Sequence, residues 1–258
     1  MLLAVDIGNT NIVFALCEGN AIKAQWRIRT DAQRTADEYA VWLFALMGQQ
    51  GFAARDVSAA IISSVVPDAI FALKTFSRNY LHCEPVVIAN GAVDLGMAVR
   101  LDNPAELGAD RLLNAFAAWE SWRQPLVVID FGTATTFDVV SGAGEYLGGG
   151  IAPGINLSLD ALKHAAARLT GIAIAHPEKV IGTTTIGAMQ SGIYYGYAGL
   201  IEGIIRRIEA ERGEAVKVIA TGGLAPLYAD ATTAIAHVDA DLTIRGLRLA
   251  YQKLKDKK

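Results

Sequence analysis

The chain begins with three apolar segments whose length and alternation are typical of β-strands, Met1–Asp6, Asn11–Cys17 and Ala21–Arg29. The next segment, Thr35–Gln50, repeats its apolar residues at helical spacing, and its first residues, Thr35-Ala-Asp-Glu38, fit a capping box. Four further elements are predicted before the middle of the chain: a buried strand over Val57–Val66, a helix, a short strand over Pro85–Ala89 and a helix over Glu106–Trp122. This order of elements predicts an α/β structure.

The second half of the chain repeats the opening pattern. Its predicted elements are strands over Pro125–Asp130, Thr135–Val140 and Glu145–Gly149, helices over Leu157–Leu169 and Thr185–Arg212, a strand over Val216–Ala220 and a helix over Leu242–Lys255. The first strands of the two halves end at Asp6 and Asp130, an offset of 130 − 6 = 124 residues. We therefore predict a duplicated α/β domain, divided into residues 1–115 and 116–258, with a nucleotide cleft between the halves.

Each half carries the same candidate chemistry where its first strand ends. The two turns read Asp6-Ile-Gly8-Asn-Thr10 and Asp130-Phe-Gly132-Thr-Ala-Thr135. Glycine lets the backbone approach a ligand closely, and successive N–H groups with Thr or Asn side chains can surround phosphate oxygens. An aspartate at the strand end is placed to act on a cation or its water shell. A single turn of this kind is common in β-hairpins that bind nothing. The presence of one at the start of each half favours the interpretation that both bind phosphate.

Two other phosphate-binding patterns are excluded. Asp130-Phe-Gly132 matches the metal-binding triplet of protein kinases, but the sequence contains no His-Arg-Asp and no glycine-rich loop leading to a Val-Ala-Ile-Lys strand. No Gly-Lys pair occurs, which excludes a Walker A loop. Phosphate binding is therefore expected to depend on backbone donors and a metal ion.

Three more motifs have both a structural and a functional interpretation. Asp102-Asn-Pro to Asp110-Arg111 is either a helix cap with a surface ion pair or the source of a carboxylate that faces a substrate. Gly148–Gly154 is either a flexible loop before a helix or backbone packed against a ligand or a facing subunit. Thr221-Gly222-Gly223 follows a buried strand and suits a nucleotide at a helix N-terminus.

Composition narrows the function classes. The net charge is −3 and no basic stripe is present, so we expect no nucleic-acid partner. Cys17 and Cys83 have no metal-ligand spacing, which is typical of idle thiols in a reducing cytoplasm. The segment Val180–Ile201 lacks charge, but its glycines, threonines, glutamine and serine indicate a buried loop and helix, and we expect no membrane span. The apolar face of the Thr185–Arg212 helix is expected to lie in the core and to be wide enough for a partner as well.

Together the motifs resemble those of the type III pantothenate kinases. Six motifs carry the resemblance in family order along nearly the whole chain: Asp6-Ile-Gly-Asn-Thr-Asn11, Asn103-Pro104 with Gly108-Ala-Asp-Arg111, Asp130-Phe-Gly-Thr-Ala-Thr-Thr136, Gly149-Gly-Ile-Ala-Pro-Gly154, Thr185-x-x-Ala-Met-Gln-Ser-Gly192 and Thr221-Gly-Gly223. The resemblance implies a duplicated actin-like (ribonuclease H-like) fold, a homodimer, and transfer of the ATP γ-phosphoryl group to the terminal hydroxyl of pantothenate, the first step of coenzyme A synthesis.

The resemblance also implies roles for particular residues. Asp110 would be the general base, and Asp130 would hold a monovalent cation, K⁺ or NH₄⁺, beside Mg-ATP. The ATP-contacting residues would be Asp6, Ile7, Gly8, Asn9, Thr10, Asn11, Ile12, Val13 and Thr133. The pantothenate-contacting residues would be Leu101, Gly108, Ala109, Asp110, Arg111 and Thr185. Leu101 stands where relatives often have a tyrosine, so that contact differs here.

Three alternatives remain beside this hypothesis. The first is a kinase of the same fold that acts on a sugar, glycerol or acetate. The second is a non-catalytic ATP-binding regulator, against which an intact Asp110, both phosphate turns and the lack of a DNA-binding motif argue. The third is a polymer-forming or chaperone ATPase, for which 258 residues are too few.

Overall fold

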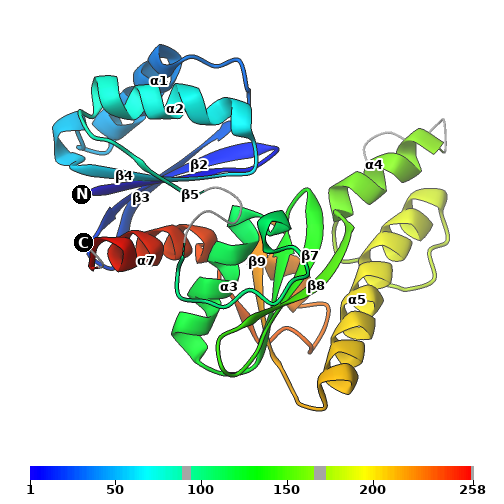
Figure 1. The fold of residues 1–258 in the computed structure, drawn as a ribbon. Helices are drawn as coiled ribbons and strands as arrows, with labels where there is room; N and C mark the ends of the chain where they lie inside the picture. The colour runs from blue at the N-terminus through cyan, green and yellow to red at the C-terminus, as the bar shows by residue number, and fades with distance from the viewer. Residues whose placement is uncertain (89–93, 166–172, 257–258) are drawn as a thin grey trace. The chain divides into compact units, whose positions relative to one another are not determined.

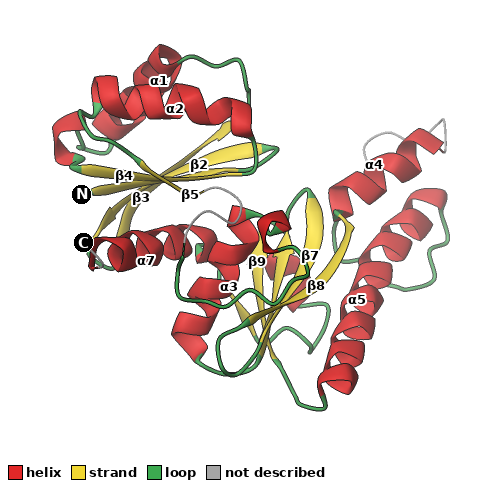
Figure 2. Ribbon diagram, viewed as in Figure 1, coloured by secondary structure: helices red, strands yellow, loops and turns green. Residues whose placement is uncertain are grey.

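The computed structural model describes residues 1–88, 94–165 and 173–256, and the chain forms two compact units (Figure 1). Unit 1 comprises Met1–Met97, Asp102–Ala117 and Leu242–Lys258, and unit 2 comprises Ala98–Leu101 and Ala118–Asp241. Both units combine one sheet with helices (Figure 2). Within the described ranges, no helix has the length and apolar character needed to cross a membrane.

The sheet of unit 1 has five strands in the order β3-β2-β1-β4-β5. The strands are β1 Leu2–Ile7, β2 Asn11–Glu18, β3 Ala21–Arg29, β4 Ala59–Ser64 and β5 Val86–Ile88. The first three are antiparallel neighbours, whereas β4 and β5 continue the sheet in parallel from β1. One face packs its apolar side chains against α1 Ala36–Gln49 and α2 Pro67–Tyr80, and α7 Leu242–Asp256 packs on β1 and β4. The short 3₁₀ helices η1 Ala54–Asp56 and η2 Pro104–Glu106 and the helix α3 Ala109–Trp122 complete the elements that begin in this unit.

The sheet of unit 2 repeats this topology in the order β10-β9-β6-β7-β8. Its strands are β6 Leu126–Phe131, β7 Ala134–Val140, β8 Tyr146–Pro153, β9 Lys217–Gly222 and β10 His237–Val238, and its helices are α4 Ile155–Ala165, α5 Thr185–Arg212 and α6 Ala225–Ala229. The antiparallel meander β6-β7-β8 corresponds to β1-β2-β3, and the parallel strands β9 and β10 correspond to β4 and β5. The predicted duplication of an α/β domain is therefore confirmed.

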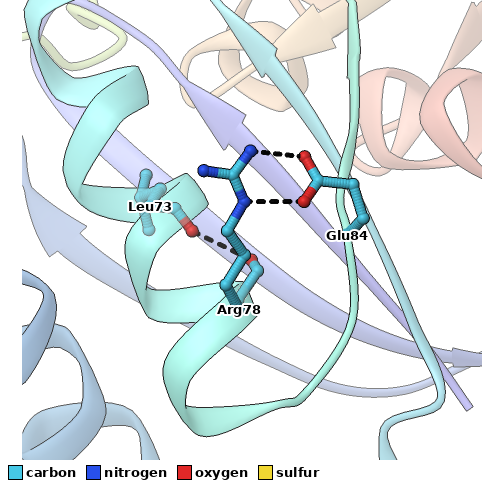
Figure 3. A network of polar contacts seen from close by, with 4 residues as sticks. Leu73, Arg78 and Glu84 are labelled. Carbon is cyan, nitrogen blue, oxygen red and sulfur yellow. Dashed lines mark hydrogen bonds and ion pairs between the residues drawn. The ribbon is translucent and has the colours of Figure 1, made fainter.

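Local sequence signals account for several helix ends. The Glu38 N–H donates to Thr35 Oγ1 at 3.3 Å and the Thr35 N–H donates to the Glu38 carboxylate at 2.7 Å, which confirms the predicted capping box of α1. Thr184 caps α5, and Gly213 ends it in the left-handed conformation at φ 67°. Arg78, in the last turn of α2, forms a two-pronged ion pair with Glu84 that lowers the pKa of the Glu84 carboxyl (Figure 3). The pair is exposed, so its contribution to stability is small.

The predicted domain boundary differs from the observed units, because α7 was assigned to the C-terminal half and instead belongs to unit 1. Gly246 of α7 lies so close to α3 that an added Cβ would be 2.5 Å from the Leu113 carbonyl oxygen. Residues Ala98–Leu101 belong to unit 2, since Arg100 N–H donates to the Tyr146 carbonyl at 2.8 Å. Such contacts between distant segments leave no local signal in the sequence.

The interpretation of Gly148–Gly154 as a loop is wrong, because β8 runs through it to Pro153. A Cβ on Gly149 would lie 1.6 Å from the Phe137 carbonyl oxygen, so glycine lets β8 approach β7 at this point. Residues 89–93 and 166–172 lie outside the described residues, so the predicted ends at Ala89 and Leu169 are not tested. The buried residues of α5 are Ser191, Tyr194, Tyr197, Ala198, Ile201 and Ile205.

Candidate active site

The first predicted phosphate turn joins β1 to β2 in unit 1. The Gly8 N–H donates to the Asn11 carbonyl at 3.0 Å, and Thr30 Oγ1 donates to the Gly8 carbonyl at 2.6 Å. Ile7 and Ile12 are buried in the core, so their side chains face away from any ligand. The side chains exposed on the turn are Asn9, Thr10 and Asn11. The turn therefore presents polar groups to solvent from a backbone fixed by its neighbours.

Asp6 precedes this turn and lies level with Ser63 of the parallel strand β4. Ser63 Oγ donates a hydrogen bond of 2.6 Å to Asp6 Oδ1. Burial raises the pKa of the Asp6 carboxyl from its ordinary 3.8 to about 6, the Ser63 hydrogen bond opposes this rise, and the charge of Asp110 adds to it. Asp6 keeps some solvent contact as a residue, although its carboxyl group is enclosed by protein. A buried carboxylate beside a second carboxylate is a favourable place for a cation.

Asp110 lies in the first turn of α3, also in unit 1, within range of the charge on Asp6. The Arg111 N–H donates to Asp110 Oδ1 at 2.8 Å. A Cβ on Gly108 would lie 2.6 Å from this same oxygen and 3.9 Å from Val65 Cγ1. Gly108 therefore leaves room for the Asp110 carboxylate to turn back over the start of the helix, and its own role is to position that group.

The helix that carries Asp110 begins later than predicted. Pro104–Glu106 form the separate 3₁₀ helix η2, and α3 starts at Ala109 rather than at Glu106. Asn103 caps η2, since its side chain accepts a hydrogen bond from the Ala105 N–H at 3.3 Å. Asp110 is consequently in the first turn of a helix and not in its interior.

The second predicted turn joins β6 to β7 in unit 2. Asp130 lies on β6 between two threonines in register, Thr136 on β7 and Thr221 on β9. These three side chains share one face of the sheet, because paired residues point to the same side. The Gly132 N–H donates to the Ala134 carbonyl at 3.0 Å and closes the turn. A carboxylate with neighbouring hydroxyl groups is a suitable set of oxygen donors for a cation.

The glycines of two further motifs pack against this second turn. A Cβ on Gly154 would lie 2.1 Å from the Thr133 carbonyl oxygen and 2.8 Å from that of Gly132. A Cβ on Gly222, whose φ is 91°, would lie 2.6 Å from the Phe131 carbonyl oxygen. Both glycines therefore allow neighbouring segments to support the turn closely, and Thr133 itself remains exposed.

The other predicted substrate residues lie in unit 2, whereas Gly108–Arg111 belong to unit 1. Leu101 packs its Cδ2 toward Gly148, 3.4 Å from where a Cβ of that residue would be. Thr185 is the exposed first residue of α5, next to the capping residue Thr184. The N-terminal turn of α5 thus presents the Thr185 hydroxyl to solvent from a rigid element.

One residue of this site was missed by the sequence analysis. Ser63 is 1% exposed and ends an apolar strand, a pattern that we interpreted only as core. Its position could have been found from topology, because a parallel neighbour of β1 must end beside Asp6. Among the described residues, no group of three or more His, Cys, Asp or Glu side chains forms a ready metal centre. Mg²⁺ would then be held by one or two carboxylates together with substrate phosphates.

Two α/β units of the same topology, each with an Asp-x-Gly turn after its first strand, define the actin-like class of two-domain folds. Solved structures show the same fold at low identity. A Campylobacter jejuni protein assigned to the Baf family of transcriptional activators is 21% identical, with a TM-score of 0.59 over 98% of this chain and 99% of that one. Component A of Acidaminococcus fermentans (R)-2-hydroxyglutaryl-CoA dehydratase is 14% identical, with a TM-score of 0.55 over 100% of this chain and 99% of that one.

The family is identified by sequence. The model of the type III pantothenate kinases matches residues 2–207. A type III pantothenate kinase of Paramagnetospirillum magneticum is 58% identical over 96% of this chain and 95% of its own. That of Rhodospirillum rubrum is 55% identical over 98% of both chains. The chain belongs to the type III pantothenate kinase family.

Proposed function

We propose that this protein transfers the γ-phosphoryl group of ATP to the terminal hydroxyl of pantothenate, the first step of coenzyme A synthesis. Family membership over nearly the whole chain is the observation that carries this proposal. The geometry of unit 1 supports it, since a buried carboxylate, Asp6, and a second carboxylate, Asp110, lie within electrostatic range beside a polar turn. A cytoplasmic location follows from the proposed substrates.

The two carboxylates have different roles in this proposal. Asp110 accepts the proton of the pantothenate hydroxyl as phosphoryl transfer proceeds, and Gly108 leaves the space in which its carboxylate turns. Asp6 would hold Mg²⁺ or a water of its shell, and the bound Mg²⁺ would neutralise charge on the ATP phosphates. The exposed Asn9, Thr10 and Asn11 bind phosphate oxygens in the first turn, and Thr133 does so in the second.

Pantothenate contacts are proposed for Gly108–Arg111, Leu101 and Thr185. Thr185 has an exposed hydroxyl at a helix start, which suits a hydrogen bond to a polar acceptor. Leu101 has an apolar side chain and cannot replace the hydrogen bond of a tyrosine. We therefore propose an apolar contact at Leu101.

An acceptor panel tests the proposal against its rivals. Purified protein with Mg-ATP should phosphorylate pantothenate and leave glucose, glycerol and acetate unreacted. Turnover of one of those acceptors in place of pantothenate would support a different kinase of the same fold. ATP binding with no turnover of any acceptor would support the regulator, the role suggested by the name of the Campylobacter jejuni relative.

Activity is expected to need a monovalent cation as well as Mg²⁺. Asp130 is half-buried, and its neighbours in register, Thr136 and Thr221, add hydroxyl oxygens on both sides. K⁺ or NH₄⁺ bound there would offset the cost of holding the carboxylate within the protein. Rates should fall strongly when potassium is replaced by a bulky organic cation and recover when K⁺ or NH₄⁺ is added back. Equal rates in both buffers would exclude this role for Asp130.

A homodimer is the proposed assembly. Large apolar side chains are exposed on β8, α4, the segment before α5 and the first turn of α5, and α4 packs against α5 (Figure 1). These residues are Ile151, Leu157, Leu162, Val180, Ile181 and Ile186. Ile181 is 81% exposed. We propose that these side chains lie in the dimer interface, because soluble monomers rarely leave many large apolar side chains of neighbouring elements in solvent.

Light scattering measures the assembly directly. We expect twice the 27.4 kDa mass of one chain for the wild type, and a shift to the single-chain mass for Ile181→Asp. Phe71→Asp is the matched control, because Phe71 is 78% exposed on α2 of the other unit. A wild-type protein with the mass of one chain at working concentration would refute the dimer.

A further inference from the structure

Ser63 is a buried residue whose hydroxyl group donates a hydrogen bond to an ionisable side chain. It is 1% exposed, at the carboxyl end of β4, and its Oγ donates to Asp6 Oδ1 at 2.6 Å. The backbones of the two residues are already paired in the parallel ladder, which fixes Ser63 level with Asp6. The hydroxyl is therefore held at a defined position by the sheet.

Two other buried serines of unit 1 use their hydroxyls for local backbone structure. Ser64 Oγ donates to the Val66 carbonyl at 2.8 Å and accepts from the Val66 N–H at 2.9 Å. Ser77 Oγ donates to the carbonyl of Leu73, one turn earlier in α2, at 2.9 Å. The Ser63 bond differs because it adds nothing to turn or helix geometry and instead determines where one carboxylate oxygen lies.

The segment after Ser63 also lies against the second carboxylate. The Val65 N–H donates to the Ile7 carbonyl at 3.1 Å, so the end of β4 is attached to the first phosphate turn. Val65 Cγ1 is 3.9 Å from the Cβ position of Gly108, the residue that leaves room for Asp110. The end of β4 therefore contacts Asp6 directly and also lies next to Gly108, the residue beside Asp110.

We propose that Ser63 is a positioning residue that orients the Asp6 carboxylate toward the metal-bound phosphates of ATP. This inference rests on the proposed function of Asp6 in nucleotide binding. One oxygen, Oδ1, is occupied by the Ser63 hydrogen bond, which directs the other oxygen of the same carboxylate to the ligand side. A hydrogen bond to a charged group is stronger than one between neutral groups, so its loss has a measurable effect on geometry.

Ser63→Ala should affect nucleotide binding and transfer but not pantothenate binding. We expect kcat to fall about 10- to 100-fold, the range for a lost hydrogen bond to a charged group. The Kd for the Mg²⁺ complex of a non-hydrolysable ATP analogue, measured by calorimetry without turnover, should rise by about 10-fold. The KM for pantothenate should remain within about twofold, because Ser63 acts only through Asp6. Ser63→Thr keeps the hydroxyl and should recover most of both losses.

Ser77→Ala is the matched control, since it removes an equally buried hydroxyl, also 1% exposed, from the same unit. Its urea midpoint should resemble that of Ser63→Ala, with kcat and nucleotide affinity unchanged. Two outcomes overturn the inference: wild-type values of kcat and Kd in Ser63→Ala, or equal losses in Ser63→Ala and Ser77→Ala. A wild-type protein without pantothenate-dependent turnover would instead contradict the proposed function, and the calorimetric comparison would still test the role of Ser63.

Discussion

Asp110→Asn is expected to lower kcat by about 10²–10⁴-fold, the usual contribution of a general base. A primary alcohol is a poor nucleophile until its proton has an acceptor, and Asn keeps the shape of the side chain but cannot accept that proton. The Asn side-chain oxygen can still accept the Arg111 N–H bond now made by Asp110 Oδ1 at 2.8 Å, so the local geometry should survive. The loss corresponds to about 3–5 kcal/mol of barrier. Since phosphoryl transfer has a loose transition state that depends less on a base, the lower end is the more natural result.

Steady-state kinetics with both substrates check this expectation. KM values should change much less than kcat, because the proposed base acts on the proton in the transition state, whereas Asn keeps the shape with which Asp110 would contact pantothenate. Asp102→Asn is the control, since Asp102 is an exposed carboxylate of the same segment. Near-normal kcat in Asp110→Asn together with an inactive Asp102→Asn would reverse the two assignments.

Asp6→Asn is expected to lower activity and to raise stability at neutral pH. In the proposed function Asp6 faces the metal-bound phosphates, so removing its charge should reduce kcat by about 10²–10³-fold, as for other electrostatic groups of active sites. Stability changes in the opposite direction because the pKa of Asp6 is about 6 in the folded protein against an ordinary 3.8. The folded state therefore binds the proton more tightly than the unfolded chain does, and stability falls as the pH rises through this interval.

The difference in stability between Asp6→Asn and the wild type should depend on pH. Above pH 6 the wild type holds an ionised, buried Asp6, and Asn removes a penalty of about 2 kcal/mol, allowing for the partial solvent contact of the residue. The difference between variant and wild type should shrink as the pH falls from 6 toward 3.8, where Asp6 is protonated in the folded state. Urea unfolding at pH 8, 6 and 4 measures the difference in free energy of unfolding between the variant and the wild type. A variant less stable than the wild type at pH 8 would show that Asp6 has a structural role instead.

Enzyme activity should also depend on the protonation of the Asp6 carboxyl group. Since Asp6 acts as a charged group, kcat/KM for the free enzyme should decline as the pH falls through about 6. An acidic limb near pH 4 would mean that Asp6 is ionised more easily in solution than its burial indicates.

The architecture could be predicted from sequence because each half repeats strong local signals. The strands before Asp6 and Asp130, the capping box at Thr35 and the long helix after Thr185 are all encoded over a few residues. The assignment of α7 to unit 1 could not be predicted, since it depends on close packing between Gly246 and Leu113, 133 residues apart (246 − 113). The extent of β8 was missed because glycines weaken strands in general, whereas Gly149 is needed here for close approach to Phe137.

The residues of the candidate site also divide into those that a sequence motif reveals and those that only the fold reveals. Motif residues such as Asp6 and Asp110 were identified because each lies in a recognisable segment of the sequence. Ser63 lies in no motif, and its proposed role rests on the pairing of β1 with β4 and on its hydrogen bond to Asp6. Likewise, a ligand contact was one of the interpretations given for Gly148–Gly154 and for Thr221–Gly223, and in the structure Gly154 and Gly222 pack on the backbone of the second turn. Sequence spacing indicates that such glycines matter and does not show which atoms they approach.

Release of ADP with and without pantothenate tests the central claim most directly. Protein in buffer with Mg²⁺, K⁺ and ATP should release ADP slowly when alone and rapidly when pantothenate is added, with one phosphorylated pantothenate formed for each ADP. Asp110→Asn, assayed beside it, should release little ADP under either condition, which excludes a contaminating kinase. A rate of ADP release that is the same with and without pantothenate would contradict the assignment.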